Sequence, residues 1–563
     1  MGVIKVSRSR SANRFWHIID ELDDRSSLTT AEVIEVLLGK RGFSESDSSK
    51  FLYPKLKHLS DPFRIPDMAL AVERIEKALR RDERVLIYTD YDVDGMSSGA
   101  LLYRFLVELG AQVEVFIPER QSEGYGLSLE GLEHSLEKGP IQLIIALDCG
   151  TTSIEEVDWV KSQGIDILII DHHELAETIP AADAVVNPQR GETDQYLSTV
   201  GLIFKLCHAF LKAQGDPELF DLRSHMDYVA LGTVSDLVPL VDDNRIMVYY
   251  GLKQLGITHH IGLQELMRVA KVRKVPDPST IGFVIGPRLN ASGRLTSAEE
   301  GWELLVTQDH SAARRIAQSL DALNRKRQKI ELEAYEAAKM MASEMQEEER
   351  SHCLIVDSTD WHQGVVGIVA SRLQRDYYLP SIVITVDEDG MGKGSARSIP
   401  GLSMMEALRA HSNYLKAFGG HSMAAGLEIE HSSVPEFRKA MNQWFAENTS
   451  DSDYQERLLA DMSVPAQILD RELAEGLSTM EPFGQGNPAP VLVVRKVRMK
   501  SPPRYFGTKH IKFKAVADQN TFDAVGFGLG SGDVPEGPFD LAGHWEMDSF
   551  TGRPIFRISD WRW

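Results

Sequence analysis

The sequence predicts an α/β protein with a parallel sheet, a second and smaller α/β domain, and a C-terminal β-barrel. Strand-like apolar runs alternate with helical stretches from about residue 84 to residue 252, which is typical of βαβ units. A charged stretch from 311 to 349 contains no Gly or Pro and predicts a long helix that joins two domains. From residue 458 onward, short strand-like runs alternate with Gly- and Pro-rich turns, which is typical of a small barrel.

Length and composition limit the class of protein. The chain has 563 residues, enough for roughly three to five domains, and no apolar run is long enough to span a bilayer. The cysteines are too far apart for a disulfide framework, and the N-terminus lacks the apolar core of a secretory signal. We therefore expect a protein of the reducing cytoplasm, with no membrane partner, and nothing demands more than a monomer. The expected divisions are a helical extension over 1–60, the parallel-sheet domain over 61–270, a connecting region with the long helix over 271–350, the second α/β domain over 351–450 and the barrel over 455–563.

Three strand-like runs each end on an aspartate. They are VLIYTDYDVDG (85–95), IQLIIALDCG (141–150) and IDILIIDHHE (165–174). A single Asp after a strand is usually a turn or helix cap. The carboxyl ends of parallel strands meet at one edge of a sheet, where ligands bind in open α/β folds. The three endings together therefore predict a site.

The first ending contains three acids, Asp90, Asp92 and Asp94, followed by Gly95. An EF-hand calcium loop would need Glu at its twelfth position, but that position is Leu101, and a strand rather than a helix precedes the acids. If the chain stays extended, the three side chains face the same way. A helix is expected to follow the glycine, over 97–106.

The carboxylates at the strand ends would repel one another without a cation between them, so they predict a metal site. Asp92 and Asp94 join Asp148, His172 and Asp236 in an oxygen-rich set, with Asp90 beside them. Such a set prefers Mn²⁺ or Mg²⁺. Five ligands are too many for one tetrahedral ion and favour two ions roughly 3.5–4 Å apart, as in nucleases and phosphatases. Neighbouring side chains at a strand end diverge, so His172 is expected to reach the metal and His173 the substrate, while Cys149 points away.

One segment is strongly basic although the whole chain has a net charge of −22. The net charge by itself argues against a nucleic-acid partner. Residues 495–514 contain eight Lys or Arg and no acid, with Tyr505, Phe506 and Phe513 among them. Cations with interleaved aromatic rings suit a nucleic-acid single strand, whereas the alternative is a solvated basic hairpin. The candidate DNA-binding residues here are Arg504, Tyr505, Phe506, Lys509 and Lys512.

Four motifs, DYDVDG, LDCG, DHH and GTVSD, occur in the order found in the DHH phosphoesterase superfamily, which the chain resembles. The resemblance implies that the metal ligands are Asp90, Asp92, Asp94, Asp148, His172 and Asp236. It also implies that His173 faces the substrate and acts in catalysis, together with Asp148 and Asp236 as the ligands nearest a bridging position.

Later segments resemble the RecJ family of single-stranded-DNA exonucleases. These are IPERQSEGYGL (117–127), IGPRLNASGRL (285–295), DWHQGVVGIVASRL (360–373), GSARSIPG (394–401), FGGHSMAAGL (418–427) and PFGQGNP (482–488). A guanidinium fork and a histidine suit phosphate recognition, and glycines let the backbone approach a ligand. The chain has Ala396 where the family usually has Gly and Ser422 where it usually has Ala, which bears on fine positioning. The substrate-binding candidates are Arg120, Tyr125, Arg288, Asn290, Arg294, Ser395, Arg397, Ser398, Gly420 and His421.

The resemblance implies a function. It is a metal-dependent exonuclease that acts 5′ to 3′ on single-stranded DNA in recombination and repair, with an oligonucleotide-binding (OB-type) barrel as its third domain. It also implies single-strand-binding protein and a RecQ-type helicase as partners. Two alternatives stay open: a phosphodiesterase of short oligonucleotides, which would not need the barrel, and a non-catalytic binding scaffold, which would not need the acids and histidines.

Overall fold

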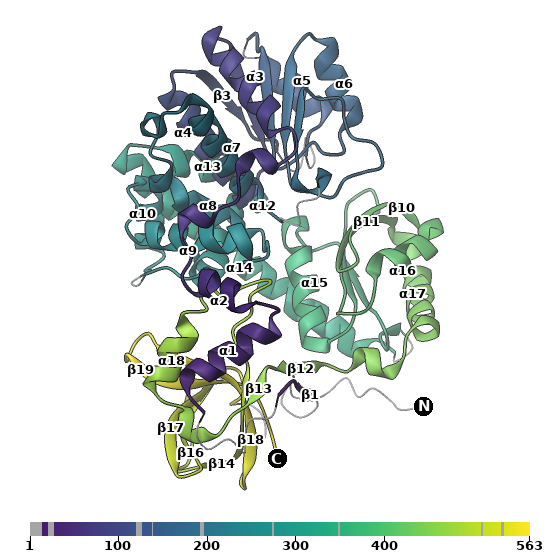
Figure 1. Ribbon diagram of the computed structural model, residues 1–563. Helices are drawn as coiled ribbons and strands as arrows, with labels where there is room; N and C mark the ends of the chain where they lie inside the picture. Colours follow the sequence, from purple (N-terminus) through teal and green to yellow (C-terminus); the bar gives the residue numbers. More distant parts are fainter. Residues whose placement is uncertain are drawn as a thin grey trace. The chain divides into compact units, whose positions relative to one another are not determined.

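The computed structural model describes residues 14–20, 28–119, 126–137, 139–191, 196–272, 275–346, 349–507, 510–530 and 534–563 (Figure 1). The chain forms two compact units. The first unit comprises Glu45–Arg325 and Met480–Ala489. The second unit comprises Met1–Ser44, Lys326–Thr479 and Pro490–Trp563.

The first unit contains the predicted parallel sheet, which confirms that part of the fold. Its five strands lie in the order β3-β2-β4-β5-β6, and every pair is parallel. The strands are rich in Val, Ile and Leu because both faces of the sheet are buried. The strand bounds are β2 Arg84–Thr89, β3 Gln112–Phe116, β4 Leu143–Leu147, β5 Asp166–Ile170 and β6 Ala184–Val186.

Helices cover both faces of this sheet (Figure 1). Alternate strand residues such as Val85 and Ile87 pack with α3 (Met68–Arg80), α4 (Val93–Glu108) and α7 (Thr199–Gln214) in one core. The residues between them, such as Leu86 and Tyr88, pack with α5 (Leu129–Leu136) and α6 (Ile154–Ser162) in another. This two-sided packing follows from the alternation of side chains along a strand.

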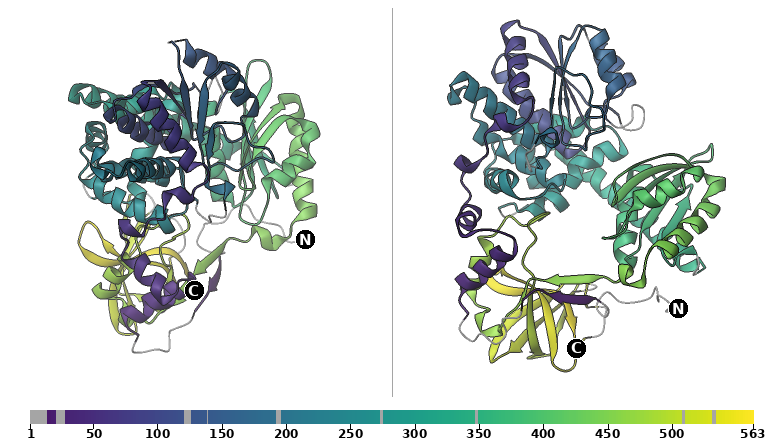
Figure 2. Two further views of the ribbon diagram at one scale, coloured as in Figure 1. Left: turned by 45° about the horizontal axis from the view of Figure 1, so that its top comes forward. Right: turned by 45° about the vertical axis from the view of Figure 1, so that its right-hand side comes forward.

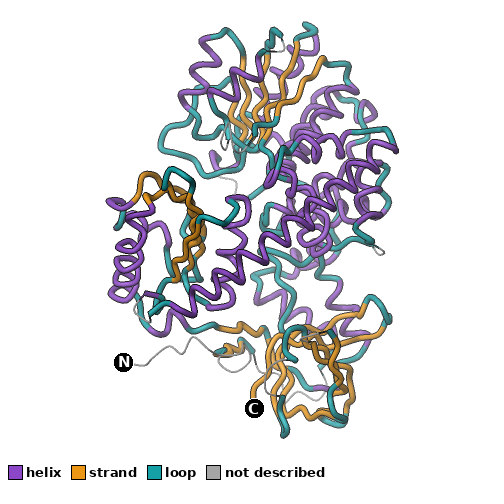
Figure 3. The backbone as a smooth tube through the Cα atoms, turned by 180° about the vertical axis from the view of Figure 1, so that it is seen from behind, coloured by secondary structure: helices purple, strands orange, loops and turns teal. Residues whose placement is uncertain are grey.

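The rest of the first unit is helical. It contains α2 Glu45–Leu52, α8 Met226–Ser235, α9 Asp242–Gly256, α10 Ile261–Val269, α11 Pro278–Thr280, the π-helical turn η6 Ile281–Ile285, α12 Gly286–Leu295 and α13 Glu299–Val306. The long helix predicted from the charged stretch is α14, His310–Glu344, which Figure 3 shows as an unbroken tube. Among the described residues, no helix combines the length and apolar character that crossing a membrane requires.

The second unit contains the second α/β layer structure. Its five-stranded sheet has the order β10-β11-β9-β8-β7, in which only β7 and β8 are parallel (Figure 2). One face packs on α15 and the later part of α14, and the other face packs on α16 and α17. The bounds are β7 Leu354–Ser358, α15 Gln363–Tyr377, β8 Ser381–Val386, β9 Met391–Arg397, α16 Met404–Ala410, β10 Leu415–Gly420, β11 Ala424–Glu430 and α17 Val434–Asn448.

The same unit contains the predicted barrel, which is confirmed. Strands β14, β18, β19, β17 and β16 pair in this order, and the pairing of β14 with β16 closes the ring. The N-terminal stretch expected to be helical includes helix α1 (Thr30–Lys40), but it also contributes strand β1 (Phe15–Ile18), which pairs with β12. The remaining bounds are β12 Arg457–Ala460, β13 Met462–Ser463, α18 Arg471–Ser478, β14 Leu492–Met499, β15 Arg504–Phe506, β16 His510–Ala517, β17 Asn520–Gly526, β18 Phe539–Asp548 and β19 Arg553–Arg562.

Candidate active site

Three neighbouring strands of the first sheet end side by side, and the residue after each is an aspartate. Strands β2, β4 and β5 are followed by Asp90, Asp148 and Asp171. The ladder continues past the strands, because the amide of Asp90 donates to Leu147 (3.2 Å) and that of Asp148 to Ile170 (3.1 Å). The expected convergence of the strand endings on one sheet edge is therefore confirmed.

The expected extended conformation of the first motif is wrong. Helix α4 begins at Val93, well before the predicted start at Ser97, and Asp92 is its N-cap. The Asp92 Oδ1 atom accepts hydrogen bonds from the amides of Asp94 (2.8 Å) and Gly95 (3.1 Å). A carboxylate in this position satisfies amides that have no partner within the helix, which favours early helix initiation.

The glycine of this motif is required by close packing. A Cβ atom on Gly95 would lie 2.4 Å from the carbonyl oxygen of Asp90, which is a backbone atom that cannot move aside easily. Gly232 in α8 is similarly confined, because its Cβ would lie 2.4 Å from Oδ1 of Asp94 and 2.7 Å from Val200. Both glycines therefore let the acidic side chains come close together.

Residues at the N-terminus of α7 donate hydrogen bonds to two of the carboxylates. Asp94 accepts from the amides of Thr199 (2.7 Å) and Val200 (3.1 Å), and the Thr199 hydroxyl donates to Asp148 Oδ1 (2.8 Å). Asp148 itself has a left-handed backbone conformation (φ 62°), which is uncommon for a residue other than glycine. Sequence reasoning missed Thr199, because no local pattern links a helix start to acids that lie far away in the chain.

His172 lies between two of these acids. Its Nε2 atom is 3.4 Å from Asp148 Oδ1 and 3.4 Å from Asp236 Oδ2, and this buried atom forms no hydrogen bond with any residue that the structure describes. Asp236 is at the C-terminal end of α8. The structure thus brings together the ligand atoms of three overlapping residue groups, each within 4.8 Å: Asp94 with His172 and Asp236, Asp90 with Asp92 and Asp148, and Asp148 with His172 and His173.

The electrostatics of this cluster favour a bound cation. Burial and the charges of Asp148 and Asp236 raise the pKa of Asp92 to about 7, and burial and Asp148 raise the pKa of Asp236 to about 6. Burial alone would lower the pKa of His172, but Asp148 chiefly, with Asp236 and Asp94, raises it to about 10. These shifts reflect negative charge without enough compensation. An oxygen-rich set with an imidazole suits Mn²⁺ or Mg²⁺.

His173 is held by a separate carboxylate. Its Nδ1 atom lies 2.7 Å from Asp171 Oδ1, and Asp171 is 1% exposed and also accepts from the amide of Thr151 (3.1 Å). Burial lowers the pKa of His173, but the hydrogen bond and charge of Asp171 outweigh it, so the pKa lies above its ordinary value. His172 and His173 therefore have different nearest carboxylates. Their ring nitrogens nevertheless lie within 4.8 Å of each other and of an Asp148 oxygen, so the two side chains diverge less than expected. Sequence reasoning placed Asp171 beside them without this orienting role.

Arg397 is the most enclosed of the predicted phosphate-binding residues. Its Nε donates to the Ser371 hydroxyl (3.1 Å) and its Nη1 to the Ser395 hydroxyl (3.0 Å), and burial lowers its pKa. No carboxylate of the described residues forms an ion pair with it. Gly367 of α15 passes close to its Nη2, since a Cβ there would be 3.2 Å away. Arg397 is thus a partly buried cation whose side-chain partners are neutral hydroxyl groups.

The other candidates of this domain have different environments. His421 is exposed in the turn between β10 and β11, where its amide donates to Ala424 (2.8 Å). Gly420 needs its positive φ of 134°, and a Cβ there would lie 2.4 Å from the carbonyl oxygen of Ala424. Ser398 is 3% exposed and its hydroxyl donates to Leu402 (2.7 Å), which gives it a structural role in its own loop.

Helix α12 carries Arg288, Asn290 and Arg294 and runs along the acidic cluster. A Cβ on Gly286 would lie 2.9 Å from Ser235, and one on Gly293 would lie 3.3 Å from the carbonyl oxygen of Tyr91. Arg288 donates to Asp321 (2.9 Å) in α14, whereas Asn290 and Arg294 are partly exposed. The helix is therefore adjacent to the acids, although Arg288 is bound to another carboxylate.

The basic segment of the barrel forms strands β14 to β16. Arg504, Tyr505 and Phe506 are exposed on β15, and Arg504 pairs in register with Lys512 on β16. Phe513, expected among the charges, is instead 4% exposed and packs against Phe539 and Trp561 in the barrel core, because alternate residues of β16 face inward. Three further candidates, Arg120, Tyr125 and Lys509, lie outside the described residues.

Comparisons with known proteins agree with this site and fold. Models of the DHH family N-terminal domain, the DHHA1 domain and the RecJ OB domain match residues 84–233, 350–447 and 460–559. The single-stranded-DNA-specific exonuclease RecJ of Bacillus subtilis is 35% identical over 94% of this chain and 67% of its own length. The enzyme of the same name from Haemophilus influenzae is 37% identical over 79% of this chain and 80% of its own. The chain belongs to the RecJ family.

Solved RecJ structures show the same fold. RecJ of Thermus thermophilus in complex with Mn²⁺ has a TM-score of 0.82 and 26% identity, with 98% of this chain and 80% of that chain covered. A second exonuclease RecJ, bound to manganese, has a TM-score of 0.60 and 30% identity, with 68% of this chain and 95% of that chain covered. Both contain Mn²⁺, the kind of ion that suits the acidic cluster described above.

Proposed function

We propose that this protein is a metal-dependent exonuclease that hydrolyses phosphodiester bonds of single-stranded DNA. The observation that carries the proposal is the cluster of Asp90, Asp92, Asp94, Asp148, His172 and Asp236 at the carboxyl edge of a parallel sheet. It is supported by membership of the RecJ family, whose named relatives are single-stranded-DNA-specific exonucleases.

Two ions fit the ligand arrangement better than one. A first group of possible metal ligands comprises Asp94, His172 and Asp236, and a second comprises Asp90, Asp92 and Asp148. When bound, Mn²⁺ or Mg²⁺ ions would supply the positive charge and the water activation that phosphodiester hydrolysis needs. Asp148 lies beside His172 of the first group and is itself a member of the second group. It is therefore the residue best placed to be a ligand of both ions.

The protein's own proton donor is His173. The Nδ1 atom of His173 is hydrogen-bonded to Asp171, and this contact raises the pKa of the ring above its ordinary value, which favours the protonated form with a proton on Nε2. It would donate that proton in a hydrogen bond to a non-bridging phosphate oxygen and stabilise the charge that develops there. Asp171 acts through His173 and is a positioning residue.

Substrate contacts are proposed for three regions. In the second α/β domain, Arg397 and His421, with Ser395 and Gly420, would bind a phosphate of the DNA or its 5′ end. Asn290 and Arg294 on α12 would contact the backbone near the scissile bond. On the barrel, exposed Arg504, Tyr505 and Phe506, with partly buried Lys512, would bind the remaining strand through charge and base stacking.

Several finer parts of the proposal rest on the family resemblance alone. These are the 5′ to 3′ direction, the roles in recombination and repair, and the partners single-strand-binding protein and a RecQ-type helicase. The monomeric state is proposed because nothing in the sequence demands a larger assembly. A reducing compartment, the cytoplasm, is supported by three buried cysteines that form no disulfide.

The test is hydrolysis of an oligonucleotide labelled at its 3′ end, with Mn²⁺, Mg²⁺ or EDTA. Wild type should shorten the strand from its 5′ end and should leave an equivalent duplex intact. EDTA should stop the reaction, and Asp236→Asn should slow it by about 1,000-fold or more, since an essential charge interaction in the transition state is lost.

Glu177→Gln is the matched control, because Glu177 is an exposed acid shortly after the DHH motif and its removal changes the net charge equally. It should retain wild-type activity. Tight DNA binding without hydrolysis in any metal would show that the chain is a scaffold. Hydrolysis confined to very short oligonucleotides would instead identify a small-substrate phosphodiesterase.

A further inference from the structure

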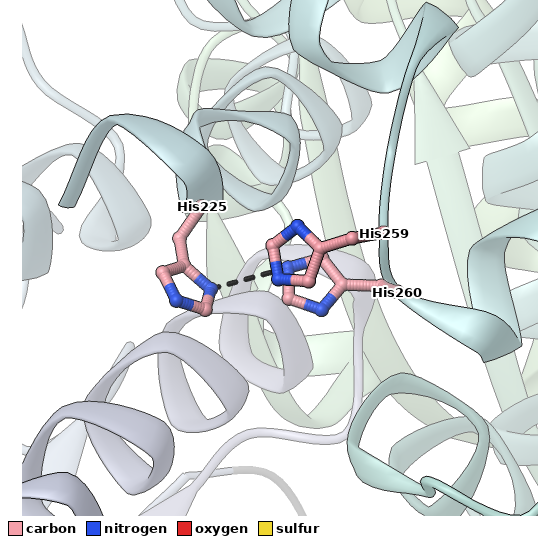
Figure 4. Close-up of side chains that lie close together, drawn as sticks. All are labelled: His225, His259 and His260. Carbon is pink, nitrogen blue, oxygen red and sulfur yellow. Dashed lines mark hydrogen bonds between the residues drawn. The ribbon is translucent and has the colours of Figure 1, made fainter. Parts of the chain in front are cut away.

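A second group of possible metal ligands lies in the first unit, made only of imidazoles. His225 ends the short helix η5 (Leu222–His225) directly before α8, while His259 and His260 precede α10. One ring nitrogen from each residue lies within 4.8 Å of the other two. Figure 4 shows the three rings turned toward one another from the two segments. None of these residues belongs to the acidic cluster.

Two of the three nitrogens already have the spacing of metal ligands. His225 Nδ1 and His260 Nε2 are 3.1 Å apart. Two imidazole nitrogens that bind one tetrahedral Zn²⁺ at about 2.0–2.1 Å would be roughly 3.3 Å apart. A small displacement of either ring would therefore allow an ion to replace their mutual hydrogen bond, and a ring nitrogen of exposed His259 already lies within 4.8 Å of both nitrogens.

The surroundings hold two of the rings in place. The ring of His225 stacks on Phe220 at 4.6 Å, and that of His260 stacks on Tyr228 at 4.3 Å. His225 is 8% exposed and His260 is 2% exposed, whereas His259 is exposed and leaves a route to solvent. Ordered ligands with one open side match the geometry of a site that keeps a position for water.

One carboxylate and one guanidinium lie near the group. Asp227 is fully buried, and its Oδ1 lies 3.5 Å from His260 Nε2. Arg104, which donates to the Tyr228 hydroxyl (3.1 Å), is the opposing cation.

We propose that His225, His259 and His260 form a second metal site, which takes a late first-row transition ion such as Zn²⁺ rather than Mg²⁺ or Mn²⁺. Imidazole suits zinc, copper and nickel, whereas magnesium prefers oxygen ligands, so the two sites of this unit differ in selectivity. The ion joins the start of α8 to the start of α10. Asp236 lies at the other end of α8, so the ion stabilises a helix that carries a ligand of the acidic cluster.

The test is zinc binding to the full chain in saturating Mg²⁺, measured by equilibrium dialysis with metal analysis. Wild type should bind one Zn²⁺ that Mg²⁺ does not displace, and zinc should raise its Tm. In His259→Ala the affinity for this ion should fall by more than the roughly 10–100-fold that loss of an outer ligand partner costs. His225→Gln should behave in the same way, and His134→Ala, which removes an exposed histidine of α5, should bind zinc as wild type does.

A variant of the acidic cluster separates the two sites. Asp92→Asn with Asp236→Asn should keep the zinc ion, because its ligands are the imidazoles. With Co²⁺ as the probe, the same variant should keep the visible absorption bands of nitrogen-bound tetrahedral cobalt, and His259→Ala should lose them. Equal zinc binding by wild type and His259→Ala, or no zinc in the acidic-cluster variant, would overturn the proposal.

Discussion

At the scale of single residues, Asp171 raises the pKa of His173 and favours its protonated form. Their 2.7 Å contact keeps the pKa of the histidine above its ordinary value. Asp171→Asn keeps the shape of the side chain but removes its negative charge. The pKa of His173 should therefore fall, and a smaller fraction of the histidine should be protonated. We expect activity to drop by about 10–100-fold, as for the loss of other orienting partners. The measurement is kcat for single-strand hydrolysis from pH 6 to pH 9.

The pH profile separates this role from a merely structural one. The alkaline limb of kcat should move to lower pH in Asp171→Asn, and KM should change little. Asp158→Asn, which alters an exposed acid on α6, is the control and should match wild type throughout. An equal loss of activity at every pH would contradict the proposed effect on the histidine.

The acidic cluster should make the metal-free protein less stable as pH rises. The pKa of Asp92 is about 7 in the folded protein and near 3.8 when unfolded, so the folded state holds this proton more tightly. That contribution to stability is complete below the unfolded value and is lost as the pH rises through 7. His172, raised to about 10, acts in the same direction above its ordinary 6.5. The Tm in EDTA should therefore fall between pH 6 and pH 8.

Mn²⁺ should reverse this trend, because it binds best to ionised carboxylates. The buried His225 has a lowered pKa and acts in the opposite direction near pH 6.5, so the comparison must be with Asp92→Asn. This variant should lose part of the pH-dependent fall in Tm. If its Tm and that of wild type fall in parallel in EDTA, Asp92 does not titrate near neutral pH.

The sequence alone predicted which acids and histidines gather, but not all of the residues that hold them. Asp90, Asp148 and Asp171 follow strands directly, and strand ends can be recognised from a short apolar pattern. Thr199 contacts Asp94 and Asp148 across a large sequence separation, which only the packing of α7 determines. Phe513 was wrongly expected at the surface because composition does not reveal which face of a strand is inside.

At the scale of elements, α8 lies so close to the start of α4 that only glycine fits between them. Gly232→Ala would place a methyl group 2.4 Å from Asp94 Oδ1. We expect the Asp94 carboxylate to shift, Mn²⁺ to bind more weakly, and stability to fall by about 1–3 kcal/mol, as for other overpacked sites. Calorimetric Mn²⁺ titration and denaturant unfolding measure the two effects.

Gly282→Ala is the matched control, because a Cβ at Gly282 would meet no atom within 4 Å. It should leave both the metal affinity and the free energy of unfolding near wild type. Unchanged Mn²⁺ affinity in Gly232→Ala, with loss of stability alone, would show that the contact supports the fold and not the site.

Elements with a strong periodic pattern were predicted, and one with a competing local interaction was not. The parallel strands are uninterrupted apolar runs and α14 is a long charged stretch without Gly or Pro, and the structure confirms both. The stretch after β2 was expected to stay extended, but the Asp92 side chain caps α4 and starts the helix early. Here the hydrogen bonds from the backbone amides to the Asp92 side chain favour a helix over the extended conformation that the alternation of strand faces would require.

At the scale of the whole molecule, a late segment of the chain completes the first unit. Residues Met480–Ala489 belong to it, and the Gln485 carbonyl accepts from the amide of Leu240 (2.7 Å), in the loop that follows Asp236. Gly486 has φ 71°, and a Cβ there would lie 2.9 Å from Pro239. Gly486→Ala should cost about 1–3 kcal/mol through backbone strain and should weaken Mn²⁺ binding, because the loop after Asp236 loses its restraint.

Thermal unfolding with and without Mn²⁺ measures both effects. Gly537→Ala is the control, since a Cβ at Gly537 would meet no atom within 4 Å and the residue has no positive φ. It should unfold as wild type does. A Gly486→Ala protein that is less stable but binds Mn²⁺ normally would restrict the role of this segment to folding.

The position of this segment affects how the protein matures during synthesis. A ribosome releases the chain from its N-terminus, and domains generally fold in that order. All ligands of the acidic cluster have emerged by Asp236, but the loop that follows this residue gains its partner only after Gln485 has been made. Prematurely terminated chains would therefore contain every metal ligand yet lack this restraint. We therefore expect full metal affinity only in chains that extend past Gln485.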